Sequence, residues 1–242
     1  MAADEPAFGR IWLRRRRERE RHRAGLDADR IAAAALRLAD AEGLAAVSMR
    51  RLATELGAGT MSLYRHVSGR DDVVELIVDA AYGDEPPPAP TGDWRADLRA
   101  LAGRTRRIML AHPWLAFEAS ARPRFGPNAL RQAEAALAVA RQAAQEIDLA
   151  SALLDAVQSF TLGAVQRELA ERHAERVSGL TEDQWRHAVG PYLRQALAAG
   201  EYPHLEERIL NGADPDNAER FAFGLDRVLD GIDAWLATVR GP

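Results

Sequence analysis

The sequence predicts an all-α protein in which a small N-terminal group of helices is joined to a larger C-terminal helical domain. Apolar residues recur at helical spacing through most of the 242 residues, and alternating β-branched segments are almost absent. Four prolines fall between Gly83 and Gly92, and prolines this dense cannot continue a helix. We therefore predict a stiff linker over residues 83–92, with one helical part on each side of it.

Composition narrows the class of protein. Apolar residues make up 47% and charged residues 28% of the chain, which is ordinary for a folded soluble domain. The absence of cysteine excludes disulfides, thiolate metal sites and cysteine nucleophiles. No apolar run approaches the roughly 20 residues that span a bilayer, and the N-terminus carries charges where a signal peptide needs an apolar stretch. We expect a cytoplasmic protein without a membrane partner.

Residues 1–26 are predicted to form a basic, flexible arm. Such an arm is typical of a nucleic-acid contact, and arginine suits the negative potential of a narrow minor groove. A solvated charged leader or a helix extension is the alternative. The basic excess lies in Arg14, Arg15, Arg16, Arg17, Arg19, Arg21 and Arg23.

Four helices are predicted in the N-terminal part. The first begins at the N-cap Asp27 and ends at Gly43, and the second runs from the N-cap Ser48 to Gly57. A third, over residues 60–67, places Leu63 and Val67 inward. A fourth extends from residue 71 to about residue 82, with apolar residues along one stripe.

The C-terminal part is predicted to contain longer helices. Asp93 caps the first of them, which runs to residue 111, and residues 128–145 form the next. A long helix covers residues 148–176, and Thr181 with Gln184 matches a capping box for the helix that follows. A final helix begins after Pro215. We predict a kink or restart at Gly190 and Pro191.

The second and third helices form the motif that carries the chemistry. Two helices joined by a glycine-containing turn, the second of them short, place a recognition helix in the DNA major groove. Residues 48–73 read SMRRLATELGAGTMSLYRHVSGRDDV. This segment resembles the DNA-binding domain of the TetR family, whose recognition helix ends in Leu-Tyr-X-His before a short polar turn and a connecting helix. The resemblance covers about residues 27–82 and implies a helix-turn-helix domain there.

The resemblance also implies roles for individual residues. Ser48 and Arg50 lie where the second helix begins and can reach a DNA phosphate. Thr60, Met61 and Ser62 start the recognition helix and are expected to face base edges, where methyl groups and hydroxyls can distinguish bases.

Four further residues are expected to contact the DNA backbone, namely Tyr64, Arg65, His66 and Arg70. Arg65 is the one that could reach a guanine edge instead. Core packing for Tyr64 and a helix C-terminal cap for His66 stay open as alternatives.

Residues 93–242 are expected to form a regulatory and dimerisation domain. Phe160-Thr-Leu-Gly163, preceded by proline breaks, resembles the tetracycline-repressor branch. This resemblance implies a homodimer, built on the helix from residue 148 and the last helix, and an effector pocket. Each aromatic in the following set is, taken by itself, more often part of an ordinary core. The expected pocket residues are Trp114, Phe117, Phe125, Gln158, Phe160, Trp185 and His187.

Metal and catalytic chemistry have little support in the sequence. The segment 118–122 offers no histidine for a chelated magnesium, so we expect a metal-free apolar or aromatic effector and no cofactor. The histidines lack metal-ligand spacing, and no Gly-X-Ser-X-Gly elbow or phosphate loop is present. Glu168, Glu171 and Glu175 alternate with arginines and are interpreted as an ion-paired, solvated face.

The sequence thus predicts a DNA-binding transcriptional regulator, and most specifically a repressor that a small, largely apolar ligand releases from a palindromic operator. Its partners are double-stranded DNA, a second copy of the chain and an unidentified effector. The alternative is a ligandless architectural DNA-binding or protein-interaction dimer. A cavity of several hundred cubic ångströms favours the first, while an all-helical enzyme would need a convergent polar cluster that the sequence does not show.

Overall fold

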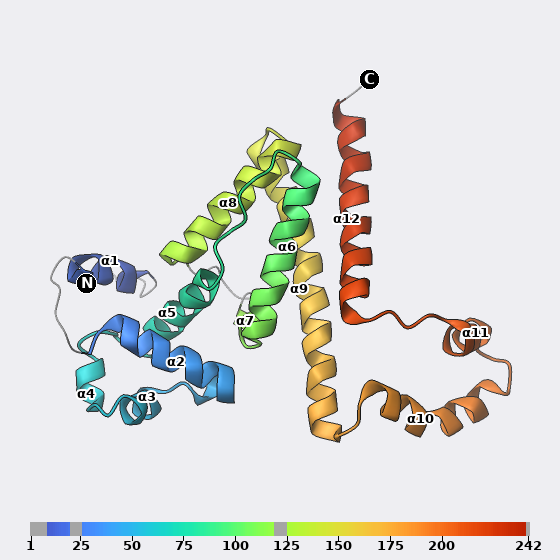
Figure 1. Cartoon of the computed structure of the whole chain (residues 1–242), viewed down its shortest axis with the longest axis horizontal. Helices are drawn as coiled ribbons and strands as arrows, with labels where there is room; N and C mark the ends of the chain where they lie inside the picture. The colour runs from blue at the N-terminus through green and yellow to red at the C-terminus, as the bar shows by residue number, and fades with distance from the viewer. Residues whose placement is uncertain (1–8, 20–25, 119–124, 241–242) are drawn as a thin grey trace, which may run out of the picture.

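The computed structural model describes residues 9–19, 26–118 and 125–240, without the side chains of residues 16–19 and 240. Every regular element within these ranges is a helix, as predicted. The helices form two parts that lie side by side, with the N-terminal part at one end of the molecule and the last helix toward the other (Figure 1). Within the described residues, no helix is both long and apolar enough to cross a membrane.

The N-terminal part contains α2 (Ala28–Glu42), α3 (Met49–Glu55), α4 (Thr60–Leu63) and α5 (Arg70–Gly83). The predicted caps are confirmed. The Asp27 side chain accepts a hydrogen bond from the Arg30 amide at 2.8 Å, and the Ser48 hydroxyl accepts one from the Arg51 amide at 3.3 Å. A short 3₁₀ turn, η1 (Leu44–Ala46), connects α2 to α3 and was not anticipated.

The recognition helix is shorter than the prediction of residues 60–67. The α-helix ends at Leu63 because the amides of His66 and Val67 both donate to the Leu63 carbonyl, at 2.8 and 3.0 Å, and close a tight turn. Leu63 and Val67 are both fully buried, as their spacing predicted. The turn therefore keeps the inward face of the expected helix while it shortens the helix itself.

The expectation of a flexible N-terminal arm is wrong for its middle section. Residues Arg10–Arg19 form helix α1, which packs on the N-terminal core. Burial of an apolar side chain fixes this helix, because Ile11 is only 1% exposed and belongs to the same cluster of buried side chains as Ile31 and Leu52. Arg15 also pairs with Asp29 on α2. The expected contacts of Arg21 and Arg23, and of the side chains of Arg16, Arg17 and Arg19, lie outside the described residues.

The C-terminal part is built around α9 (Ile147–Ser178), which packs against α6 (Trp94–Ala111), α8 (Pro127–Ala143) and α12 (Asn217–Arg240). Buried side chains of these four helices form a second core. A short helix, α7 (Leu115–Glu118), follows α6. The predicted cap at Asp93 is confirmed, since its side chain accepts hydrogen bonds from the amides of Arg95 and Ala96.

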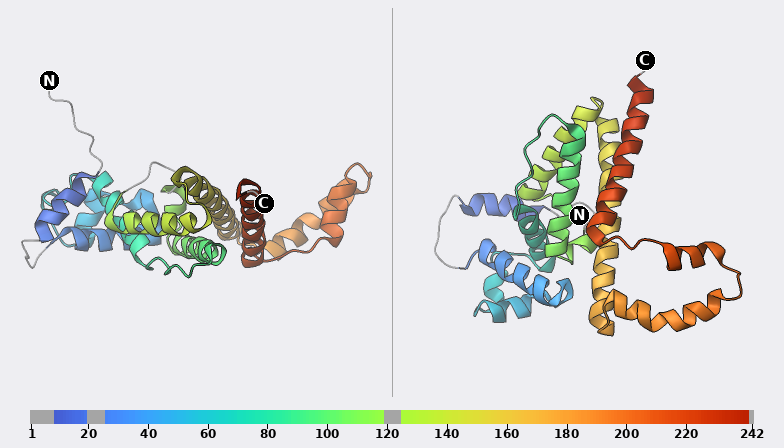
Figure 2. Two further views of the ribbon diagram at one scale, coloured as in Figure 1. Left: turned by 90° about the horizontal axis from the view of Figure 1, so that it is seen from above. Right: turned by 45° about the vertical axis from the view of Figure 1, so that its right-hand side comes forward.

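Two further helices project away from this body, α10 (Glu182–Leu197) and α11 (Pro203–Asn211) (Figures 1 and 2). The capping box predicted at Thr181 and Gln184 is present. Pro191 lies inside α10, so the helix does not restart there, and the alternative of a kink stays a prediction. The sequence did not separate α11 from its surroundings, although Pro203 at its first position is typical of a helix start.

Candidate DNA-binding surface and the joint to the C-terminal part

The helix-turn-helix presents its second helix to solvent. Gly57 has φ of +59°, a left-handed conformation that side chains other than glycine rarely adopt, and it turns the chain from α3 into α4. Met61 in the first turn of α4 is 78% exposed, while Thr60 and Ser62 are half-buried beside it. The two helices lie at the outer edge of the N-terminal part (Figure 1). The first turn of α4 is therefore accessible to a DNA groove.

Other predicted DNA contacts flank this turn. Ser48 and Arg50 are exposed at the start of α3, and Arg65 is exposed after α4. Tyr64 is 45% exposed, so core packing does not account for it. The His66 side chain is half-buried, and its Nδ1 has no hydrogen-bond partner among the described residues.

Arg70 has a role that the sequence analysis missed. Its Nε donates to the Val47 carbonyl at 3.0 Å and its Nη2 to the Leu44 carbonyl at 2.9 Å. Arg70 therefore fixes the turn between α2 and α3 against the start of α5. The local sequence does not predict these hydrogen bonds, because the two carbonyls lie more than twenty residues before Arg70.

The structure does not gather the seven expected pocket residues into one site. Trp114 is buried and donates its indole N–H to Asp40 on α2 at 2.8 Å. Phe160 packs against Phe221, with ring centroids 5.7 Å apart. The remaining five side chains are exposed, namely Phe117, Phe125, Gln158, Trp185 and His187.

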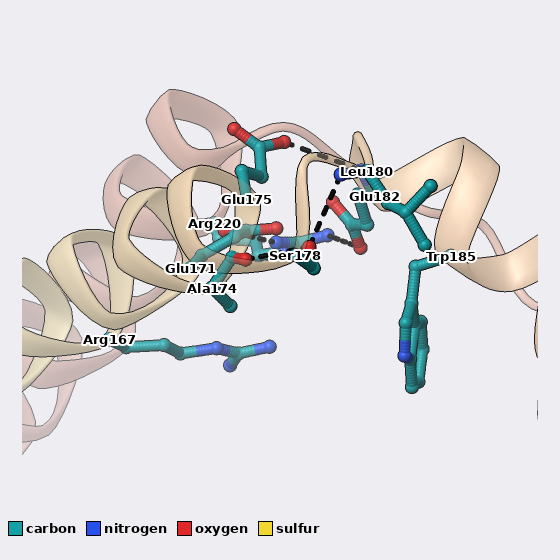
Figure 3. Close-up of a pocket in the computed structure, with 9 residues that line it drawn as sticks. All are labelled: Arg167, Glu171, Ala174, Glu175, Ser178, Leu180, Glu182, Trp185 and Arg220. Atoms are coloured by element: carbon teal, nitrogen blue, oxygen red, sulfur yellow. Dashed lines mark hydrogen bonds and ion pairs between the residues drawn. The ribbon is translucent and has the colours of Figure 1, made fainter.

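Trp185 does line a pocket of about 320 Å³, formed by the end of α9, the start of α10 and Arg220 of α12 (Figure 3). Arg167 extends along one side of this pocket. Glu171 and Glu182 also line the pocket, and their carboxyl groups share a hydrogen bond. This hydrogen bond raises the pKa of Glu182 and lowers the pKa of Glu171. Charged side chains border this pocket, but most of the surface that lines it is apolar.

The acidic face of α9 is only partly as predicted. Glu168 is buried, and its carboxylate pairs with Arg106 at 2.8 Å and with Arg172 at 2.6 Å. It is ion-paired, as expected, but it is not solvated. It ties α9 to α6 within the C-terminal part.

A histidine joins the N-terminal part to the C-terminal part. His112, at the end of α6, is buried, and its two ring nitrogens lie 2.8 Å from Asp40 on α2 and 2.8 Å from Asp84 at the end of α5. Burial alone would lower the pKa of His112, but the hydrogen bonds and negative charges of the two carboxylates outweigh it and raise the pKa. A protonated His112 therefore fastens both α2 and α5 to α6.

Two more contacts hold α5 to the C-terminal part. The Asp79 carboxylate accepts hydrogen bonds from the amides of Asn128 and Ala129, at 2.7 and 3.0 Å, and so caps α8 from outside that helix. Arg104 of α6 is 2% exposed and donates to the carbonyls of Tyr82, Glu85 and Pro86 at the end of α5. The segment predicted as a stiff linker is therefore pinned to α6 along its first residues.

The raised pKa of His112 predicts a pH dependence of stability. The stabilisation is fully present below the ordinary histidine pKa of about 6.5 and is lost as the pH rises through the higher pKa of the folded state. We expect wild type to lose about 1 to 2 kcal/mol of stability more than His112→Gln between mildly acidic and mildly alkaline pH. Urea unfolding at several pH values measures this.

His187→Gln is the matched control, because His187 is exposed on α10. It should follow the wild-type pH profile. An equal loss of stability in wild type and His112→Gln would contradict the ion-paired joint.

The fold and its exposed recognition turn define a helix-turn-helix DNA-binding protein with a second, larger helical domain. Residues 31–77 match the model of the bacterial regulatory proteins of the tetR family, and residues 86–236 match the tetracyclin repressor-like C-terminal domain. The chain therefore belongs to the TetR family. It is a DNA-binding transcriptional regulator, and members of this family are regulators rather than enzymes.

Three relatives illustrate the similarity. The HTH-type transcriptional repressor DrrR1 of Streptomyces coeruleorubidus is 38% identical over 96% of this chain and 86% of its own. The class E tetracycline repressor of Escherichia coli is 31% identical over 88% of this chain and 93% of its own. The structure of ActR from Streptomyces coelicolor in complex with actinorhodin superposes with a TM-score of 0.74 at 31% identity, covering 88% of this chain and 97% of ActR.

Proposed function

We propose that this protein is a homodimeric repressor that a small, largely apolar organic ligand releases from a palindromic operator. The observation that carries the proposal is the accessible first turn of α4, with Met61 almost fully in solvent and Arg50 and Arg65 exposed around it. This arrangement suits base contacts from the helix and phosphate contacts from the arginines. The protein acts on DNA in the cytoplasm.

Two arguments support a dimer: the affinity that specific DNA binding requires, and the exposed apolar side chains of the C-terminal part. A single helix-turn-helix buries little DNA surface, and pairing two of them about one helical turn apart gives specific affinity. Apolar side chains are exposed on α9 and α12, which a partner subunit would cover. The most exposed of these are Val177, Phe223 and Val239.

The effector is proposed to act through the C-terminal domain, residues 93–242. ActR, whose structure was solved with actinorhodin and with (S)-DNPA, is similar to this chain over most of its length. The hydrogen-bonded joint at Asp79, Arg104 and His112 supplies a physical connection between that domain and α5. Ligand binding then shifts the population toward an arrangement in which the two recognition helices no longer match successive major grooves.

Selection of bound duplexes from a random DNA pool tests the proposal. We expect a consensus with two-fold symmetry, bound by two subunits, and release of that DNA by at least one compound in a panel that includes actinorhodin. A consensus without symmetry would contradict the dimeric repressor. A symmetric consensus that no small molecule releases would favour the ligandless architectural dimer.

A further inference from the structure

Helix α1 is held in place on the DNA-binding part at several points. Ile11 is buried in the N-terminal core, and the Gly9 amide donates to the Glu75 carboxylate of α5 at 3.3 Å. Arg15 pairs with Asp29 of α2. These contacts hold α1 across both α2 and α5, so the face of α1 that carries Ile11 and Arg15 lies against the protein at a fixed position.

Arg14 of α1 reaches the turn that follows the recognition helix. Its Nη2 donates to the His66 carbonyl and to the Asp72 carboxylate, the latter at 3.1 Å, and its Nη1 lies 3.5 Å from the Ser68 hydroxyl. The same Asp72 oxygen accepts the Ser68 amide at 2.6 Å. One guanidinium thus connects the end of the recognition segment to the start of α5.

The recognition helix depends on such support because it is short. With only four residues, α4 makes few hydrogen bonds of its own, and the carbonyls after it have no helical partner. A cation close to these carbonyls is favourable, since the C-terminal end of a helix carries partial negative charge. The angle at which α4 meets DNA is therefore set largely by what holds residues 64–69.

We infer that α1 is a brace for the recognition helix and that Arg14 is a positioning residue, which supports operator binding from within the protein and does not contact a phosphate itself. Its two terminal nitrogens are already directed at three acceptors of the same chain. The inference rests on the proposed operator binding, and it gives a different function from the minor-groove contact that the arginine-rich segment suggests.

Arg14→Lys separates a brace from a phosphate contact, because lysine keeps the charge but cannot reproduce the planar fork of donors. A phosphate contact would tolerate this change, whereas a brace would not. We expect Arg14→Lys to weaken binding to the selected operator about tenfold, equivalent to the loss of one charge-assisted hydrogen bond. The slope of log affinity against log salt should stay at the wild-type value, and binding to random-sequence DNA should be unchanged.

Two variants calibrate the measurement. Arg50→Gln removes an exposed arginine that is expected at a phosphate, and it should reduce the salt slope by about 1 for each subunit. Leu13→Ala changes a residue of α1 that is 67% exposed, and it should bind as wild type does. Wild-type operator affinity in Arg14→Lys, with a reduced salt slope in Arg14→Gln, would show Arg14 to be a phosphate contact and overturn the inference.

Hydrogen exchange of the free protein gives an independent readout. Backbone amides of residues 60–69 should exchange faster in Arg14→Lys than in wild type, while amides of α9 are unaffected. Unchanged exchange in residues 60–69 would overturn the brace even if DNA binding were lost. If the wild-type protein selects no DNA, the proposed function fails, but the exchange experiment still tests the brace.

Discussion

Replacing Met61 by glutamate is expected to lower operator affinity by a factor between about 30 and 10⁴ without affecting stability. Loss of one good base contact costs roughly 1 to 3 kcal/mol, and the proposed symmetric dimer would lose this contact twice. The new carboxylate would also stand against the phosphate backbone. Because Met61 is almost fully exposed, the fold gains or loses little from the substitution. Titration of the selected operator, alongside urea unfolding, measures both effects.

Leu130→Glu is the matched control for Met61→Glu. It places the same charge at an exposed apolar side chain, but on α8 of the C-terminal part. It should bind the operator as tightly as wild type. If Met61→Glu binds within about threefold of wild type, the first turn of α4 does not enter a groove and the proposed mode of recognition is wrong.

Replacing Arg104 by methionine is expected to lower the free energy of unfolding by about 3 to 5 kcal/mol. The guanidinium is buried, and its removal leaves the carbonyls of Tyr82, Glu85 and Pro86 without this donor. Leaving one buried hydrogen-bonding group without its partner costs about 1 to 3 kcal/mol, and three carbonyls lose this donor. Urea unfolding at a fixed protein concentration measures the change, since stability of a dimer depends on concentration.

Arg107→Met provides the comparison on the same helix. Arg107 pairs with the Glu85 carboxylate at 2.9 Å, but its side chain is mostly exposed. Exposed pairs contribute about 0 to 1 kcal/mol, so this variant should remain close to wild type. Equal losses in the two variants would mean that the buried position of Arg104 is not what makes it important.

The helix boundaries of this chain were largely predictable because capping is local. Asp27, Ser48 and Asp93 each accept a hydrogen bond from an amide two or three residues later, and a pattern within one turn shows them. Leu63 and Val67 were likewise assigned inward from spacing alone. The exposed first turn of α4 could be located for the same reason, since it follows directly from the local caps and spacing, while the contacts of its residues with DNA stay a prediction.

The contacts that the sequence did not predict are made between residues that are distant in the sequence. Trp114 was expected in an effector pocket, but its partner Asp40 precedes it by 74 residues. Arg14 appeared to be part of a DNA-contacting arm, although its partners lie more than fifty residues away in the turn after α4. Helical periodicity shows that a side chain faces inward, but it does not show which element covers it. Contacts between domains therefore required the structure.

The hydrogen bonds from the first turn of α8 to Asp79 of α5 affect how gradual the proposed response to an effector can be. A hydrogen bond weakens steeply with distance and angle, and close-packed interiors do not deform continuously. A displacement of the first turn of α8 that breaks both hydrogen bonds would leave the Asp79 carboxylate without these two donors. Helix α5 would then be free to take another position against α8. The proposed release of the operator would then be an all-or-none transition with few intermediate states.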